Sequence, residues 1–419
     1  MKRFWALTIL ILSGEAIFAL PFHVARFFRP TLLHALSLSQ AELGAMQSAY
    51  GLVALLCYFP GGFLADRLSP KVLIPTALTC TGLSGLYFAS LPSRLGMFCL
   101  HIFWGMSTIL LFWGALIRAT REWGSPTTQG RSFGLLDGGR GALAALAAGL
   151  GVLILHAQAG DDLEPAQRLT ALRQIIYLYT GLTLLLAPLG YWALNALPQF
   201  RRAANGPTIR VKDLLVSATQ PAVLLQGGVI VAAYTAYKSL DFFTSYAVDI
   251  FGWDEVEAAA LSTFSVWLRP VAAIGTGFLA DRLSATSLCI WSFASLFIVY
   301  VVTLLFGVNP EASWLLLGTV CLSSLLVYGF RALYYALLEE NTIPHAATGT
   351  AVGVISLIGY SPDFFFPALA GELIDRHPGR LGYQYFFFVL ALAVLAGLLC
   401  TLAMRHFAHK QSTSEDTRR

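Results

Sequence analysis

The sequence predicts an all-α integral membrane protein with twelve transmembrane helices in two pseudo-symmetric six-helix bundles and both termini in the cytoplasm. Three observations predict this fold. Of the 419 residues, 57% are hydrophobic and only 12% are charged, whereas soluble proteins carry about 25% charged residues. The chain contains twelve apolar stretches of the length that a spanning helix needs, about 20 residues. The octapeptide GFLADRLS occurs at 62–69 and again at 277–284, as expected if one half repeats the other.

The first predicted span resembles a signal peptide, because two basic residues precede an apolar run. Glu15 interrupts that run and no clean cleavage site follows it, so we interpret the segment as a retained transmembrane helix. The twelve predicted spans are 5–28, 42–64, 71–91, 95–117, 132–156, 171–195, 218–246, 257–280, 286–307, 312–337, 346–370 and 382–405.

The distribution of lysine and arginine predicts the orientation. Sixteen of these residues fall in the segments on the side of the N-terminus and six in the opposite loops, which places both termini inside by the positive-inside rule. The basic segment 197–217 is then a cytoplasmic linker between an N-terminal bundle, 1–196, and a C-terminal bundle, 218–408, and 409–419 is a polar cytoplasmic tail. The expected location is the plasma membrane, or the inner membrane of a bacterium.

Both copies of the octapeptide fall at the cytoplasmic end of the second helix of their half. Glycine allows a neighbouring helix to approach closely, and a carboxylate at a membrane boundary can accept hydrogen bonds from a helix N-terminus. The string can therefore latch two helices together, and the alternative is a polar turn that ends a helix. The shorter pattern Gly-x-x-x-Asp-Arg within this string also occurs at Gly371, Asp375 and Arg376, on the outer side. This pattern alone is therefore weak evidence for a latch. The predicted gating residues in the two copies are Gly62, Asp66, Arg67, Gly277, Asp281 and Arg282.

Ionisable residues within membrane helices are costly and indicate function. Nine stand out within the predicted spans: Glu15, Arg26, Asp137, Arg140, Lys238, Asp241, Arg269, Arg331 and Asp363. The i,i+3 spacing of Asp137 with Arg140 and of Lys238 with Asp241 allows local ion pairs. Glu15 and Asp363 have no local partner, so they are either proton-coupling carboxylates or partners of Arg269 or Arg331. The coupling candidates are Glu15, Asp363, Asp137 and Arg140.

Arg26 and Lys238 lie 212 residues apart, close to the 215-residue offset of the octapeptide. The two halves therefore offer one cation each at pseudo-equivalent positions, and two converging cations suit an anionic group. Tyrosines near them could contribute hydroxyls and ring faces to a cavity, although membrane packing is the commoner role of such residues. The substrate-binding candidates are Arg26, Lys238, His23, Asp241, Arg269, Arg331 and Tyr360.

Several classes of chemistry have no signal in the sequence. The six cysteines lie in apolar stretches without metal-ligand spacing, so neither a disulfide framework nor a metal site is expected. There is no Walker A loop, dinucleotide fingerprint, HExxH or GxSxG motif, and no basic tract with interleaved aromatics. We therefore expect no enzyme activity, no cofactor and no nucleic-acid partner, and we expect a monomer in contact with membrane lipid.

The segment GFLADRLSPK at 62–71 resembles the signature of the major facilitator superfamily between its second and third helices, and the copy at 277–284 stands where that family has a degenerate second copy. The resemblance implies that family's fold and alternating access around a central cavity. It also implies that Asp66 engages the start of helix eleven and an arginine at the end of helix four, Arg118 or Arg121. The second copy lacks the basic residues that usually follow the signature.

Two shorter stretches, FHVARFF at 22–28 and AYKSLDFFTSY at 236–246, resemble the organophosphate:phosphate antiporter branch, in which basic residues on helices one and seven hold phosphate. Lys238 stands where that branch usually has arginine. QGRSFGLLDGGRG and RALYYALLEE are similar to stretches of uncharacterised bacterial permeases.

These observations predict a secondary transporter of a small organic anion, such as a phosphorylated, sulfonated or carboxylated metabolite. A coupling proton or ion is a possible second partner of such a transporter. Proton-coupled efflux of a hydrophobic compound is the second hypothesis, and it requires an essential lone carboxylate such as Glu15. A membrane solute sensor that does not transport is the third, and the short polar tail HKQSTSEDTRR speaks against it.

Overall fold

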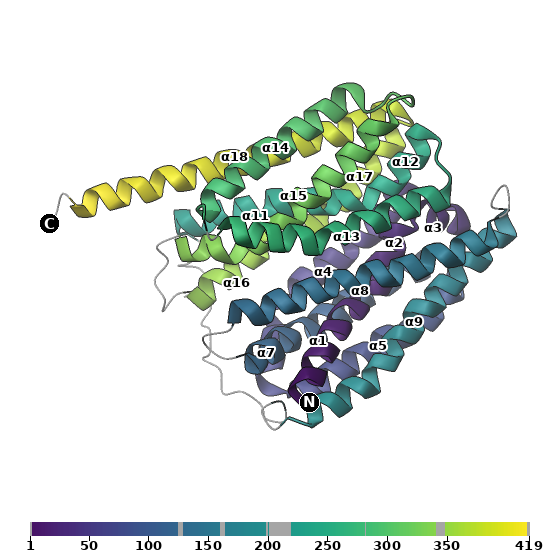
Figure 1. The fold of residues 1–419 in the computed structure, drawn as a ribbon. Coiled ribbons are helices and arrows are strands. Elements are labelled where there is room, and N and C mark those ends of the chain that lie inside the picture. Colours follow the sequence, from purple (N-terminus) through teal and green to yellow (C-terminus); the bar gives the residue numbers. More distant parts are fainter. Residues whose placement is uncertain are drawn as a thin grey trace. The chain divides into compact units, whose positions relative to one another are not determined.

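The computed structural model describes residues 2–124, 129–159, 164–197, 200, 219–280, 282–340 and 348–416. These residues form helices and no strand. Twelve of the helical segments are long and apolar enough to cross a membrane, which confirms the predicted number of spans (Figure 1).

The helices of the N-terminal part are α1 (Lys2–Phe18), η1 (Ala19–His23), α2 (Val24–Phe27), α3 (Arg29–Leu36), α4 (Gln40–Arg67), α5 (Pro70–Ala89), α6 (Arg94–Gly105), η2 (Met106–Trp113), α7 (Gly114–Trp123), α8 (Gln129–Gln158) and α9 (Pro165–Asn195). Those of the C-terminal part are α11 (Pro221–Ser239), η4 (Leu240–Phe242), α12 (Phe243–Phe251), α13 (Glu255–Ala280), α14 (Ala285–Phe306), α15 (Ser313–Glu340), α16 (Thr348–Gly359), α17 (Pro362–Arg376) and α18 (Arg380–Asp416).

Three spans contain irregular turns. The first span, Arg3–Phe27, includes the π-helical turn η1, which contains Pro21. Proline lacks an N–H and its ring clashes with the preceding turn, so the helix widens there. The fourth span includes the π-helix η2 and the seventh includes the 3₁₀ turn η4. Such irregular turns occur frequently at functional sites.

The eleventh span is interrupted. Helix α16 ends at Gly359 and α17 begins at Pro362, where proline is favoured because the first helical N–H needs no partner. The apolar segment extends from Val354 to Arg376, beyond the predicted end at residue 370. The start of the predicted span at 346–347 lies outside the described residues.

The chain divides into two compact units. The first contains residues 1–206, 241–270 and 363–375, and the second contains 207–240, 271–362 and 376–419. Within the first unit, α1 packs against α8 and α9, and α5 lies beside α9 (Figure 1). Within the second unit, α11 and α14 both pack against α18. The division into bundles 1–196 and 218–408 stays a prediction, and most of the linker 197–217 lies outside the described residues.

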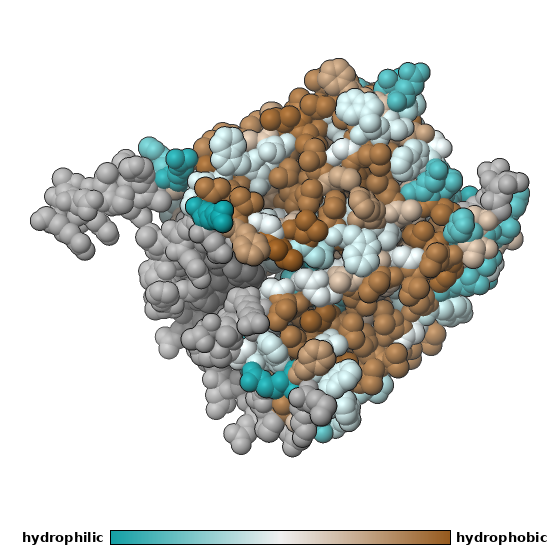
Figure 2. Space-filling model, in the orientation of Figure 1, coloured by the Kyte–Doolittle hydropathy of each residue, from teal (hydrophilic) through white to brown (hydrophobic). Residues whose placement is uncertain are grey.

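Large apolar side chains cover the outside of the helices. On the face drawn in Figure 2, hydrophobic residues occupy most of the visible helix surface. Leu56, Trp192 and Trp291 are among the exposed large side chains, and Trp291 is 70% exposed. Such a surface would be unfavourable in water but suits contact with lipid chains.

Candidate functional site

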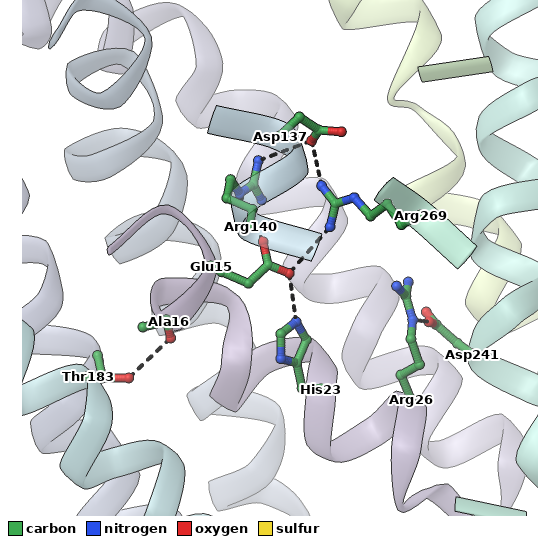
Figure 3. Close-up of polar contacts among 9 residues, drawn as sticks. All are labelled: Glu15, Ala16, His23, Arg26, Asp137, Arg140, Thr183, Asp241 and Arg269. Carbon is green, nitrogen blue, oxygen red and sulfur yellow. Dashed lines mark hydrogen bonds and ion pairs between the residues drawn. The ribbon is translucent and has the colours of Figure 1, made fainter. Parts of the chain in front are cut away.

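Four charged side chains from three helices form a network in the first unit (Figure 3). Arg140 of α8 places Nε 2.9 Å from Glu15 Oε2 of α1. Arg269 of α13 places Nη2 2.5 Å from Asp137 Oδ1 and Nη1 3.6 Å from Glu15 Oε1. The i,i+3 pair between Asp137 and Arg140 is present, at 4.0 Å. Glu15 therefore pairs with Arg269, one of the partners that the sequence left open, and also with Arg140. Each of the two arginines lies within 4.0 Å of both carboxylates.

His23 extends the network along the first span. Its Nε2 lies 3.2 Å from Glu15 Oε1, and its ring contacts the rings of Phe27 and Tyr179 edge-on. His23 follows Glu15 by eight positions and is the last residue of the π-helical turn η1. The buried Nδ1 has no hydrogen-bond partner among the described residues. The imidazole is thus placed to respond to any change of charge or position at Glu15.

We name Glu15, His23, Asp137, Arg140 and Arg269 the Glu15 network. Glu15, Arg140 and Arg269 are buried, whereas the Asp137 side chain is 31% exposed. Removing one partner of a buried ion pair costs about 3–5 kcal/mol, because the other charge is left uncompensated. The partly exposed Asp137 is the carboxylate of the network that can leave its arginine most easily, since water can solvate it.

Glycines make room for the two arginines. A Cβ on Gly141 would lie 2.9 Å from Cδ of Arg269, and one on Gly14 would lie 3.2 Å from Cδ of Arg140. Both distances are tighter than ordinary van der Waals contact. The stretch GGRG at 138–141 therefore combines an intramembrane cation with the small residues that allow another helix to approach it.

We expect Gly141→Ala to displace Arg269 and to destabilise the protein by about 1–3 kcal/mol, the usual effect of overpacking. The matched control is Gly138→Ala on the same helix, because a Cβ at Gly138 would meet no described atom within 4 Å. Both changes raise helix propensity equally. Thermal unfolding of the purified variants in detergent measures the difference, and equal midpoints would contradict the close contact at Gly141.

Arg26 and Asp241 form a second buried pair. Nε of Arg26 in α2 lies 2.5 Å from Oδ1 of Asp241 in η4, and Thr244 donates to the Arg26 carbonyl at 3.3 Å. Because the spacing of Asp241 suggested a local partner at Lys238, this pairing across 215 residues is a result of the fold that the sequence did not indicate. Lys238 in α11 is fully buried and belongs to the second unit, so the convergence of Arg26 with Lys238 stays a prediction.

The second unit contains a group of tyrosines beside a cation. Tyr237 and Tyr234 stack at 5.4 Å, and Tyr360 meets Tyr234 edge-on at 5.0 Å. The guanidinium of Arg331 lies 5.1 Å from the centre of the Tyr237 ring. Aromatic faces and a cation in one place suit a ligand with both a ring and a negative charge. Asp363, the remaining candidate, is buried in the first turn of α17 in the first unit.

Sequence reasoning missed a further buried group, near the expected outer ends of the helices. Glu255, at the start of α13, accepts from Thr31 at 2.5 Å and from Arg168 Nε at 2.9 Å, and lies 2.9 Å from His34 Nδ1. Arg29 is fully buried, donates to Gln40 at 2.7 Å and stacks over Phe242 at 4.0 Å. The sequence contains little sign of this group, because Arg168 and Glu255 lie just before the predicted spans 171–195 and 257–280, where charged residues are common.

The gating candidates show a different pairing at the first octapeptide. Arg118 of α7 donates to the carbonyls of Ala65 and Leu68 at 2.6 and 3.2 Å and pairs with Glu122, so it binds the orphan carbonyls at the end of α4. Asp66 is exposed and has no ion-pair partner within 4 Å among the described residues. Arg67 lies 3.9 Å over the Phe63 ring.

The other gating candidates contribute less. A Cβ on Gly62 would meet no described atom within 4 Å, and the close helix contact falls one residue earlier, at Gly61. Arg121 and Arg282 are exposed. Asp281, the side-chain position of Gly277 and the expected start of helix eleven lie outside what the structure describes. The part of the chain that is described holds no cluster of three or more potential metal ligands.

Comparison with known proteins agrees with the helix arrangement. The family model of the Major Facilitator Superfamily matches residues 11–367. The chain is 26% identical to the inner membrane protein YqcE of Escherichia coli K12 over 91% of its own length and 90% of that protein. It is 31% identical to a probable hexose phosphate transport protein of Chlamydia muridarum, over 25% of this chain and 23% of that one.

Among solved structures, the crystal structure of the nucleoside transporter NupG superposes with a TM-score of 0.72 at 14% identity, over 96% of this chain and 99% of that one. At that identity the likeness concerns the fold alone. The match of the family model over most of the chain decides the assignment: this multi-pass inner membrane protein belongs to the Major Facilitator Superfamily of transporters.

Proposed function

We propose that the protein is a secondary transporter of a small organic anion, such as a phosphorylated, sulfonated or carboxylated metabolite. The observation that carries the proposal is the Glu15 network. Two buried arginines there bind carboxylates from other helices, and the oxygens of Glu15 and Asp137 occupy positions that an acidic substrate group could take. Arginine suits this exchange because its planar fork binds carboxylate and phosphate in the same geometry.

The balance of buried charge supports an anion. The buried cations of the described residues are Arg26, Arg29, Arg140, Lys238 and Arg269, and the buried carboxylates are Glu15, Asp241, Glu255 and Asp363. The partly exposed Asp137 balances the fifth cation by pairing with Arg269. A bound anion could replace this carboxylate beside Arg269 when Asp137 turns toward water, so that the buried cation keeps a negative partner. Efflux of a neutral hydrophobic compound would leave these cations with a structural role alone, such as pairing with carboxylates.

The similarity to probable hexose phosphate transport proteins of two Chlamydia species supports a phosphorylated substrate within this class. It covers a quarter to a third of the chain. The resemblance of residues 22–28 and 236–246 to the organophosphate branch points to the same chemistry, and Arg26 and Lys238 would supply the cations there.

A thermal-shift panel on the purified protein tests the substrate class. We expect an acidic metabolite such as glucose 6-phosphate, gluconate or a sugar sulfonate to raise the unfolding midpoint, because a ligand at 100 times its Kd adds about 2.7 kcal/mol to the stability of the folded state. Glucose is the matched neutral control for glucose 6-phosphate. Stabilisation by hydrophobic compounds with no effect of any acid would contradict the proposal and favour efflux.

A further inference from the structure

The pattern Gly-x-x-x-Asp-Arg at 371–376 closes α17, and the proposed substrate chemistry does not involve it. In the structure the Asp375 carboxylate accepts hydrogen bonds from the backbone N–H groups of Gln40 and Ala41, at 3.2 and 2.6 Å. These are the first two residues of α4. A carboxylate more than 330 residues away thus caps the helix that carries the first octapeptide at its other end.

The N–H groups at this end of α4 are divided between two caps. Ser39 and Glu42 form a capping box, in which Ser39 Oγ accepts from the Glu42 N–H at 3.2 Å and the Glu42 carboxylate accepts from the Ser39 N–H at 2.9 Å. The box leaves the N–H groups of Gln40 and Ala41 without intrahelical partners. Asp375 binds these two, and its negative charge is favourable at the positive end of the helix.

Small residues bring the backbones of α4 and α17 into contact below this cap. A Cβ on Gly371 would meet the carbonyl of Gln40, one on Gly44 would meet that of Pro367, and one on Gly51 would meet that of Asp363. Ser48 Oγ also accepts from the N–H of Ala368 at 3.1 Å. The two helices therefore meet along several turns through backbone atoms, as small residues at a membrane helix interface allow.

We propose that Asp375 is a gating residue: its carboxylate clamps the start of α4 to the end of α17 while this end of the transporter is closed and releases it when this end opens. Helix α4 lies in predicted bundle 1–196 and α17 in predicted bundle 218–408, so rocking of the bundles must break their contact once in each cycle. The clamp suits this task because Asp375 is only half-buried, so water can replace both of its hydrogen bonds on release. The proposal rests on membership of the transporter family and not on the anionic substrate.

The physical basis of the clamp is the one that the sequence suggested for Asp66, a carboxylate that accepts hydrogen bonds from a helix start. The two strings lie at opposite ends of the predicted spans, 62–67 on the expected cytoplasmic side and 371–376 on the expected outer side. At the first, Arg118 binds the end of α4 through carbonyls. The start of helix eleven, the expected partner of Asp66, lies outside the described residues. At Asp375 the structure describes both the carboxylate and the helix start that it binds.

The test measures the population of the closed end by spin-label distances between cysteines introduced at Ser37 and His377, in full-length protein without its six native cysteines and reconstituted in nanodiscs. We expect Asp375→Asn to lower the ratio of closed to open states about tenfold, the effect of losing charge-assisted hydrogen bonds, and Asp375→Glu to restore part of it. Glu42→Ala is the matched control, because it weakens the same helix end without touching α17. An unchanged distribution in Asp375→Asn, or an equal change in Glu42→Ala, would overturn the proposal.

A second pair of variants keeps Asp375 and alters its donor. Gln40→Pro removes one N–H at the first helical position, where proline is tolerated and the preceding Ser39 is already extended. Gln40→Ala retains the N–H and, like Gln40→Pro, loses the side-chain bond to Arg29. We expect Gln40→Pro to open this end more than Gln40→Ala does. Identical distributions for the two would count against the clamp even if Asp375→Asn failed to fold.

Discussion

Replacing Arg269 with alanine is expected to lower counterflow of glucose 6-phosphate, or of the acid that stabilises the protein most, by about 10- to 100-fold in reconstituted vesicles. A hydrogen bond to a charged group contributes about 1.5–3 kcal/mol, which corresponds to this range in binding. Arg269 is the one residue of the Glu15 network that reaches both carboxylates from a third helix, with Asp137 at 2.5 Å and Glu15 at 3.6 Å. Loss of Arg269 removes the cation that the acidic group of the substrate would bind after Asp137 has moved away from this arginine.

The single variant also leaves Asp137 without its short ion pair, so reduced stability alone could lower counterflow. The double variant Asp137→Ala with Arg269→Ala separates the two effects, because replacing both partners of a pair by apolar groups is often neutral for stability. We expect the double variant to regain thermal stability and to remain inactive. Arg94→Ala is the matched arginine control, because the Arg94 side chain is 64% exposed and pairs with Glu42 at the start of α4. Counterflow equal to wild type in Arg269→Ala would remove Arg269 from the substrate site.

The fold could be predicted from the sequence because the membrane imposes it. A span needs about 20 apolar residues, and every backbone N–H within lipid needs an internal partner, so apolar length alone predicts twelve helices. The break between Gly359 and Pro362 was not predicted, although Pro362 was visible. Mean hydropathy is averaged over a window of many residues, so it does not detect a break of two non-helical residues within an apolar segment.

The pairing within the site was less predictable. The sequence identified Glu15, Asp137, Arg140 and Arg269 as costly charges. It suggested local pairs for Asp137 with Arg140 and for Asp241 with Lys238, because spacing along one helix is the only distance that a sequence provides, and it left Glu15 with two possible roles. The structure pairs Glu15 with arginines of α8 and α13, and Asp241 with Arg26. These pairings depend on how the helices pack. The contact of His23 with Glu15 also spans the irregular turn η1, which a regular helical spacing does not describe.

The pattern at Gly371 and Asp375 illustrates a further limit. By frequency alone it was weak, because glycine and an Asp-Arg pair recur often in such a chain. What distinguishes it is its position beside the start of α4, where two N–H groups need an acceptor. That information is three-dimensional, and the capping box SQAE at 39–42 gave no sign that a second cap was needed.

Glu15→Gln is expected to separate exchange from proton-driven uptake. The amide retains the size of the side chain but cannot take up a proton, so uptake driven by a pH gradient should fall to background while counterflow, which needs no net proton movement, keeps at least about half its rate. The reason is charge balance. A substrate acid that binds Arg140 and Arg269 adds a negative charge beside Glu15, and like charges in one buried site are unfavourable. Protonation of Glu15 would remove the excess charge, and the adjacent His23 Nε2 at 3.2 Å is the group that could exchange that proton.

Asp363→Asn is the matched control for this prediction, because Asp363 is the other carboxylate without a local sequence partner and is equally buried, yet it lies at the start of α17 rather than in the Glu15 network. Measured in the same vesicles, Asp363→Asn should leave the ratio of gradient-driven uptake to counterflow unchanged. If Glu15→Gln retained gradient-driven uptake, the coupling proton would not be carried by Glu15. If the wild-type protein showed counterflow but no response to a pH gradient, anion exchange would replace proton coupling, with Glu15 acting as the counter-ion that the entering acid displaces from Arg140 and Arg269.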